Sequence, residues 1–187
     1  MYGVEVLVNE HDQIMRMANV MRRASLHVLN GGDLVVQDFD HMVDFVRNYA
    51  DQHHHRKEEK LLFDYMVKEL GNIGINLVKH GMLVEHDLGR LYMAELDQAL
   101  RAYENDADNS DAKLDIITNT TAYTYLIKRH IAKENEVVFT FGEKNLKEES
   151  KAYIDKQTKI IEEEAQEIGV QVKYMGILEE LEKKYLV

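Results

Sequence analysis

The stretch ADQHHHRKEEKLLF, residues 50–63, contains the residues on which the fold assignment depends. His54 and Glu58 are four residues apart, so on a helix their side chains lie one turn apart on the same face. Apolar residues continue that face in both directions, from Val46 before the pair to Leu62 after it. The stretch therefore predicts a helix that carries a histidine and a glutamate on the side facing the protein core.

A second stretch repeats this arrangement near the end of the same predicted domain. His130 and Glu134 have the same spacing, and Glu134 is in phase with Val138 one turn later. Two more histidines, His11 and His86, occur in Glu-His-Asp triplets on apolar helix faces of their own. We infer that four helices together direct four histidines and two carboxylates into one core.

Composition and periodicity predict an all-α protein. The 187-residue chain contains no proline and is rich in residues that favour helices. The apolar positions indicate four long helices, of which the second runs from about Val36 to Leu70. We expect an up-down four-helix bundle over residues 1–145 and a helical C-terminal extension over residues 146–187, packed on or beside the bundle. We also expect Asn145 and Glu148 to form a capping box at the start of the extension.

Charge and residue usage exclude several classes of function. The formal net charge of −11 argues against nucleic-acid binding, and the scattered lysines and arginines argue against a basic membrane-binding face. The chain has no cysteine, which excludes disulfides, thiol catalysis and iron–sulfur ligation. No apolar run approaches the roughly 20 residues that span a bilayer, and the first residues do not resemble a signal peptide. We therefore expect a cytoplasmic protein.

Carboxylates in the core of a bundle need a partner, because burial strongly disfavours an isolated charge. Imidazole and carboxylate together are ligands that suit iron, manganese or zinc, and a glutamate is long enough to bridge two ions. Ferritin-like carboxylate bundles use Glu-x-x-His pairs and zinc proteases use His-Glu-x-x-His, and neither motif occurs here. The pattern predicts a dinuclear metal site formed by His11, His54, Glu58, His86, His130 and Glu134.

The run of three histidines at 53–55 leaves open which of them faces the core. The residues four and seven positions before His55 are polar, whereas those four, eight and eleven before His54 are apolar. We therefore interpret His54 as inward-facing, and expect His55 and Glu59 to face solvent or to lie behind the ligands. Any single inward histidine is more commonly a hydrogen-bonded core residue, so the metal-site prediction depends on the whole set.

As a set, four blocks of the sequence resemble the hemerythrin-like family, also called the HHE cation-binding domain. The blocks are Asn9–Asp12, Ala50–Phe63, Val84–Arg90 and His130–Phe139. The resemblance covers residues 1 to about 145 and implies a non-haem di-iron centre, two iron ions joined by an oxo or hydroxo bridge. It makes His11, His54, His86 and His130 the terminal ligands and Glu58 and Glu134 the bridging ones.

The chain departs from the oxygen-carrying members of that family at one position. Those members have a fifth histidine where this chain has Met82, so we consider water, His53, His80 or a residue of the extension as the missing ligand. Tyr123 lies two turns before His130 on the same face. We interpret it as a hydrogen-bond donor to a ligand or to a bound oxygen species, with an ordinary core tyrosine as the alternative.

The resemblance implies a protein that binds or senses O₂, NO or peroxide. One alternative is a di-iron enzyme that reduces peroxide or NO, or a protein for iron storage or iron-centre repair. Another is an interaction module whose extension reports the metal state to a protein partner, although the acidic run at 162–164 is more simply a solvated face. A helical bundle without metal is the remaining interpretation.

Overall fold

A computed structural model describes residues 1–186, and within that range the chain is helical without any strand. The first bundle helix is α1 (Tyr2–Leu29), and the second consists of α2 (Val36–Phe45), the π-helical segments η1 (Val46–His55) and η2 (Glu58–Leu62), and α3 (Phe63–Glu69). The third consists of α4 (Gly71–Leu77), η3 (Val78–Met82) and α5 (Leu83–Asn105). The fourth consists of α6 (Ser110–Lys133), η4 (Glu134–Val138) and α7 (Phe139–Asn145). Two further helices follow, α8 (Glu148–Glu167) and α9 (Val170–Tyr185).

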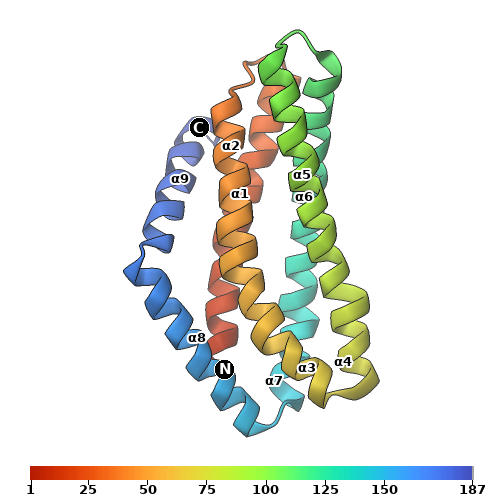
Figure 1. Cartoon of the computed structure of the whole chain (residues 1–187), viewed down its shortest axis with the longest axis vertical. Helices are drawn as coiled ribbons and strands as arrows, with labels where there is room; N and C mark the ends of the chain where they lie inside the picture. Colours follow the sequence, from red (N-terminus) through yellow and green to blue (C-terminus); the bar gives the residue numbers. More distant parts are fainter. Residues whose placement is uncertain (187) are drawn as a thin grey trace.

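Successive bundle helices run in alternating directions, and α8 and α9 lie along one side of the bundle (Figure 1). The predicted all-α bundle with C-terminal helices is thereby confirmed. The second helix was expected over Val36–Leu70, and the helical segments cover nearly that range. Its π-helical turns were not expected, because the prediction assumed the period of an α-helix throughout.

The apolar core is divided into two clusters along the bundle axis. One cluster includes Ile14 and Leu96, and the other includes Leu7 and Phe139. Along each bundle helix, the histidines and glutamates predicted to bind metal lie between these two apolar clusters. His11, for example, lies between Leu7 and Ile14. The polar layer is therefore enclosed by apolar side chains on both sides, which excludes water and strengthens the electrostatic interactions within it.

The C-terminal helices complete both apolar clusters. Leu178 of α9 belongs to the cluster with Ile14, and Ile154 of α8 belongs to the other. Gly3 permits the close approach of α8 to α1, since a Cβ there would lie 3.0 Å from Thr158 Oγ1 and 3.2 Å from Ile154 Cγ2. The extension thus packs directly on the bundle helix that carries His11.

The capping box expected at the start of the extension is wrong. The residue preceding α8 is Lys147, and its side chain makes no capping hydrogen bond. The Asn145 side-chain amide instead donates a hydrogen bond to the carbonyl of Phe141 at 2.8 Å, so Asn145 belongs to the end of α7. The preceding helix competes for the asparagine side chain, which removes it from the cap.

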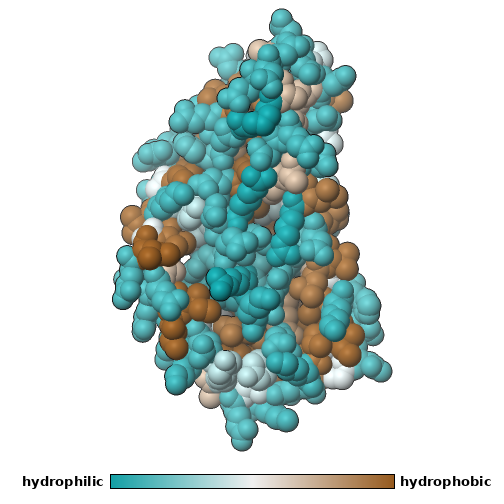
Figure 2. Space-filling view, viewed as in Figure 1, coloured by the Kyte–Doolittle hydropathy of each residue, from teal (hydrophilic) through white to brown (hydrophobic). Residues whose placement is uncertain are grey.

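Hydrophilic residues predominate on the face drawn in Figure 2, and the hydrophobic residues there form separate patches. Among residues 1–186, none of the helices combines the length and the apolarity needed to cross a bilayer.

Candidate metal centre

The six residues predicted as ligands lie together in the polar layer between the two apolar clusters. Each of their side chains is at most 2% exposed. They come from all four bundle helices: His11 from α1, His54 and Glu58 from η1 and η2, His86 from α5, and His130 and Glu134 from α6 and η4. Helices distant in sequence therefore supply one compact group of donors.

The two carboxylates lie between histidines of different helices. The oxygens of Glu58 are 3.5 Å from His54 Nε2 and 3.5 Å from His86 Nε2. Those of Glu134 are 3.2 Å from His11 Nε2 and 3.8 Å from His86 Nε2. Each glutamate thus presents its two oxygens to imidazoles on opposite sides, which is the arrangement that a bridging carboxylate requires.

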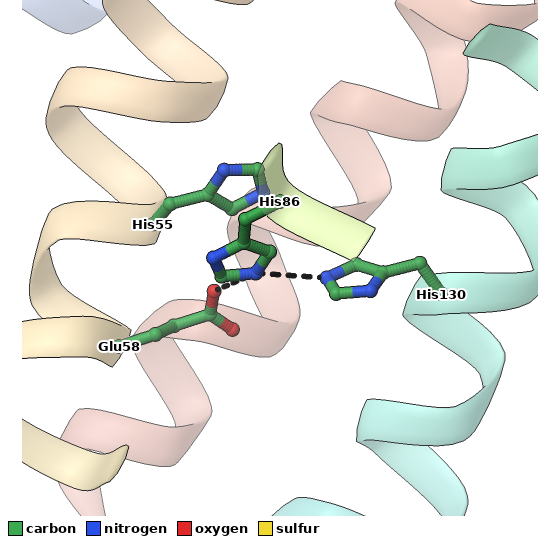
Figure 3. A group of neighbouring side chains, drawn as sticks. All are labelled: His55, Glu58, His86 and His130. Carbon is green, nitrogen blue, oxygen red and sulfur yellow. Dashed lines mark hydrogen bonds and ion pairs between the residues drawn. The ribbon is translucent and has the colours of Figure 1, made fainter. Parts of the chain in front are cut away.

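The donors form two overlapping groups that share one glutamate. One group is His55, Glu58, His86 and His130 (Figure 3), and the other is His11, His54, Glu58 and Glu134. Within each group, the candidate ligand atoms all lie within 4.8 Å of one another. Two adjacent groups with a common carboxylate have the composition expected of a dinuclear site.

His55 is the residue that the sequence prediction missed. It was expected to face solvent or to lie behind the ligands, but it is only 6% exposed, and its ring stacks on that of His86 with the ring centres 3.8 Å apart (Figure 3). Both His54 and His55 lie in η1, where hydrogen bonds join residues five apart and the turn is wider than in an α-helix. The 3.6-residue period therefore gave the wrong orientation, although the run of three histidines was itself a signal.

The five histidines of these groups share one feature. Each Nδ1 lies near an outer side-chain oxygen: His11 with Asn135 at 2.8 Å, His54 with Glu10 at 2.8 Å, His55 with Asp51 at 3.3 Å, His86 with Glu59 at 2.8 Å, and His130 with Glu85 at 2.9 Å. An oxygen that accepts from Nδ1–H fixes the ring so that Nε2 carries the free lone pair. This arrangement is typical of histidines that bind metal through Nε2.

The inner atoms of the group lack partners within the described part of the chain. These are Nε2 of His11, His54 and His55, and both carboxylate oxygens of Glu58 and of Glu134. Buried polar atoms in folded proteins are nearly always paired, because an unpaired one loses its hydration without compensation. Metal cations would satisfy these lone pairs together, so the residues present fit a metal centre.

The electrostatics of the group follow from its burial. Burial and the neighbouring Glu134 raise the pKa of Glu58 well above its ordinary value. Burial opposes a charge on His130, but the carboxylates of Glu134 and Glu85 together outweigh this effect and raise the pKa of His130 to about 9. Burial and an adjacent imidazole lower the pKa of His54 to about 3 and that of His55 well below its ordinary value. Without a metal, Glu58 and His130 therefore favour their protonated forms, and His54 and His55 favour their neutral forms.

A cavity of about 190 Å³ adjoins the group on the side of His55 and His86. Tyr123, Gly89 and Met93 also line it. The Tyr123 side chain is buried, its hydroxyl has no partner in residues 1–186, and burial raises its pKa. The tyrosine predicted as a donor therefore lies beside two histidines of the centre, with its hydroxyl unpaired.

The residues named as candidates for the missing ligand lie elsewhere. His80 is exposed, and His53 is buried in a separate cluster with Glu10 and Lys57. Met82 packs in the apolar cluster at the end of the bundle that contains Phe139. Instead, His55 is the additional imidazole within the two donor groups.

Comparison with known families agrees with this geometry. The sequence profile of the hemerythrin HHE cation-binding domain matches residues 2–141, which include every histidine and glutamate of the two donor groups. Comparisons with curated proteins and with solved structures found no match. The domain description and the convergent donors both indicate a protein that binds metal cations. On this match, which covers most of its length, the chain belongs to the hemerythrin HHE cation-binding domain family.

Proposed function

We propose that the chain is a di-iron protein that binds or senses O₂, NO or peroxide. The observation that supports the proposal is the convergence of five imidazoles and two carboxylates. Each imidazole Nδ1 lies near an outer oxygen, and Nε2 of His11, His54 and His55 and the carboxylate oxygens of Glu58 and Glu134 have no hydrogen-bond partner in the described residues. Such a mixture of ligands suits iron, and membership of a cation-binding family supports the assignment.

The two donor groups suggest which residues would hold each metal ion. His11 and His54 would hold one ion, and His55, His86 and His130 would hold the other, with Glu58 and Glu134 between them. A bound ferrous pair supplies electrons for binding or reducing a small oxidant.

The first experiment is purification without oxygen, followed by metal analysis and an optical spectrum before and after exposure to air or NO. We expect about two irons per chain and new visible absorption on exposure. One zinc or no metal, together with an unchanged visible spectrum after reconstitution with iron, would rule the proposal out.

The cavity beside His55 and His86 offers a route by which a small ligand reaches the centre. A Cβ on Gly89 would lie 3.6 Å from Tyr123 Cε2, an ordinary contact, so larger side chains there would fill the cavity. We expect Gly89→Leu to slow NO association several-fold with unchanged metal content, as measured by stopped-flow absorbance. Gly176→Leu, at an open position on α9, is the matched control. Equal rates in both variants would exclude this route.

A second candidate function is enzymatic reduction of peroxide or NO. The unpaired hydroxyl of Tyr123 favours it, because a donor in the cavity can hydrogen-bond a reacting ligand. Sustained turnover with an added reductant, lowered in Tyr123→Phe at unchanged metal content, would establish the enzyme. Binding without turnover would leave the carrier or sensor role.

A further inference from the structure

A second buried cluster of charged side chains lies beside the metal centre. Lys57 is only 2% exposed, and its ammonium contacts carboxylate oxygens of Glu10 and Glu162 and lies 3.1 Å from His53 Nε2. The glutamates and the histidine could by themselves bind a metal ion. The lysine ammonium already lies among them, so the chain supplies its own cation at this position.

Glu10 connects this cluster to the metal centre. One of its carboxylate oxygens, Oε1, contacts Lys57, and the other, Oε2, lies 2.8 Å from His54 Nδ1. The carboxylate of Glu10 therefore divides its contacts between a lysine and a candidate metal ligand.

Glu162 connects the same cluster to the C-terminal extension. It lies on α8, its side chain is 20% exposed, and its second oxygen accepts a hydrogen bond from the Gln171 amide of α9 at 3.1 Å. The expectation that the acidic run at 162–164 is a solvated face is therefore wrong for Glu162, although Glu163 and Glu164 are exposed. Only Glu162 of this run reaches Lys57, because the neighbouring positions point to other sides of the helix.

We propose that Glu162 is a positioning residue for the metal centre, through which the C-terminal extension sets how tightly the metal at His54 is held. Glu162 and Glu10 share one ammonium, so Glu10 keeps enough negative charge to hold His54 Nδ1–H. Without Glu162, Lys57 pairs with Glu10 alone and draws that charge away from His54. The imidazole then becomes a weaker and less firmly oriented ligand. This inference rests on the proposed dinuclear centre.

The test compares Glu162→Gln with Glu163→Gln in the full-length, metal-loaded protein. Both variants remove one negative charge from the same turn of α8, but only Glu162 contacts Lys57. We measure metal content, the rate of metal release to a chelator, the optical spectrum, and the melting temperature of the metal-free protein. Loss of a residue behind a ligand typically weakens metal binding about 10- to 100-fold, so we expect release from Glu162→Gln to be about 10-fold faster. Glu163→Gln should match the wild type, and Glu162→Asp should recover part of the difference.

The outcomes separate this inference from the proposed function. Unchanged metal release and spectrum in Glu162→Gln would overturn it, even if the melting temperature fell, because Glu162 would then be only a structural residue. Equal acceleration in Glu163→Gln would also overturn it, since a general charge effect would explain the result. A wild-type protein without a metal pair would overturn the inference and the proposed function together.

Discussion

Glu58 is the side chain with the most unfavourable surroundings in the absence of metal. It is fully buried, neither of its oxygens has a hydrogen-bond partner within the described residues, and it lies beside a second buried carboxylate, Glu134. Two neighbouring buried carboxylates do not both ionise without a compensating cation. The charged His130 keeps the pKa of Glu134 low in spite of its burial, so the proton goes to Glu58.

This arrangement predicts the pH dependence of the metal-free protein. The pKa of Glu58 is raised on folding, so above its ordinary value of 4.5 the folded protein keeps a proton that the unfolded chain releases. The contribution of Glu58 to stability is therefore lost as pH rises toward the folded pKa, by up to about 1.4 kcal/mol per pH unit. The glutamine of Glu58→Gln is uncharged at every pH and therefore needs no proton on burial. In chelator, we expect this variant to become more stable than the wild type as pH rises from about 5 to 8.

Melting temperatures across that range, in buffer with excess chelator, check the prediction. Glu95→Gln, at an exposed position on α5, controls for loss of a surface charge. Parallel pH curves for Glu58→Gln and the wild type would show that Glu58 ionises freely in the metal-free protein. In the metal-loaded protein the order should reverse if Glu58 is a ligand as proposed, because the substitution removes its carboxylate.

The prediction from helical periodicity and the observed structure place His55 differently. If His55 completes one donor group, His55→Gln should weaken the binding of one of the two proposed metal ions about 10- to 100-fold. Metal titration followed by elemental analysis measures this change in affinity. His80→Gln removes an exposed histidine and should change nothing. Identical metal content and affinity in the two variants would restore the interpretation of His55 as an outer residue.

Three of the π-helical segments in the described residues, η1, η2 and η4, carry candidate ligands, whereas η3 (Val78–Met82) ends four residues before His86. Segment η1 ends at His55, η2 begins at Glu58, and η4 begins at Glu134. Such turns are rare in proteins and occur frequently at functional sites. Their wider turn reduces the rotation between adjacent residues, which helps His54 and His55 to reach the core together.

Deletion of Gln52, an exposed residue within η1, tests the role of this wider turn. We expect the segment to close into an α-helix, so circular dichroism and the melting temperature of the metal-free protein should change little. Metal content should fall, because His54 and His55 can no longer face the centre together. Deletion of Asp108, in the loop between α5 and α6, is the control. Full metal content after the Gln52 deletion would show that the π-helical turn is unnecessary.

The metal centre joins all four bundle helices at mid-length. Each helix supplies at least one donor, and apolar clusters close the layer on both sides. A ligand that binds only the folded chain adds its binding free energy to folding. The centre is therefore expected to act as a cross-link between helices, in addition to any role with a small ligand.

Removing the metal should accordingly lower the melting temperature. At a free metal concentration of 100 times the dissociation constant, binding adds about 2.7 kcal/mol to the free energy of unfolding. Calorimetry with and without chelator measures the difference, which Glu134→Ala should abolish. A bundle that binds no metal would show no chelator effect, and Glu134→Ala would leave its stability intact or improved, because a buried charge is removed.

The sequence by itself determined the helices and most of the candidate centre. Apolar periodicity and the absence of proline placed the four long helices, and the same periodicity directed His54, Glu58, His130 and Glu134 toward the core. These features depend on local repetition along one helix, so they are visible without knowledge of the neighbouring helices. The assignment of the four blocks to the hemerythrin-like family is also confirmed.

The tertiary structure alone decided the remaining features. His55 turns inward in η1, which departs from the α-helical period, and Glu162 is partly buried because it contacts Lys57. Four of the five oxygens behind the histidines come from a different bundle helix, as the pairing of His11 with Asn135 shows. Each of these contacts joins residues from different helices or depends on a distorted turn, and local periodicity contains no information on either.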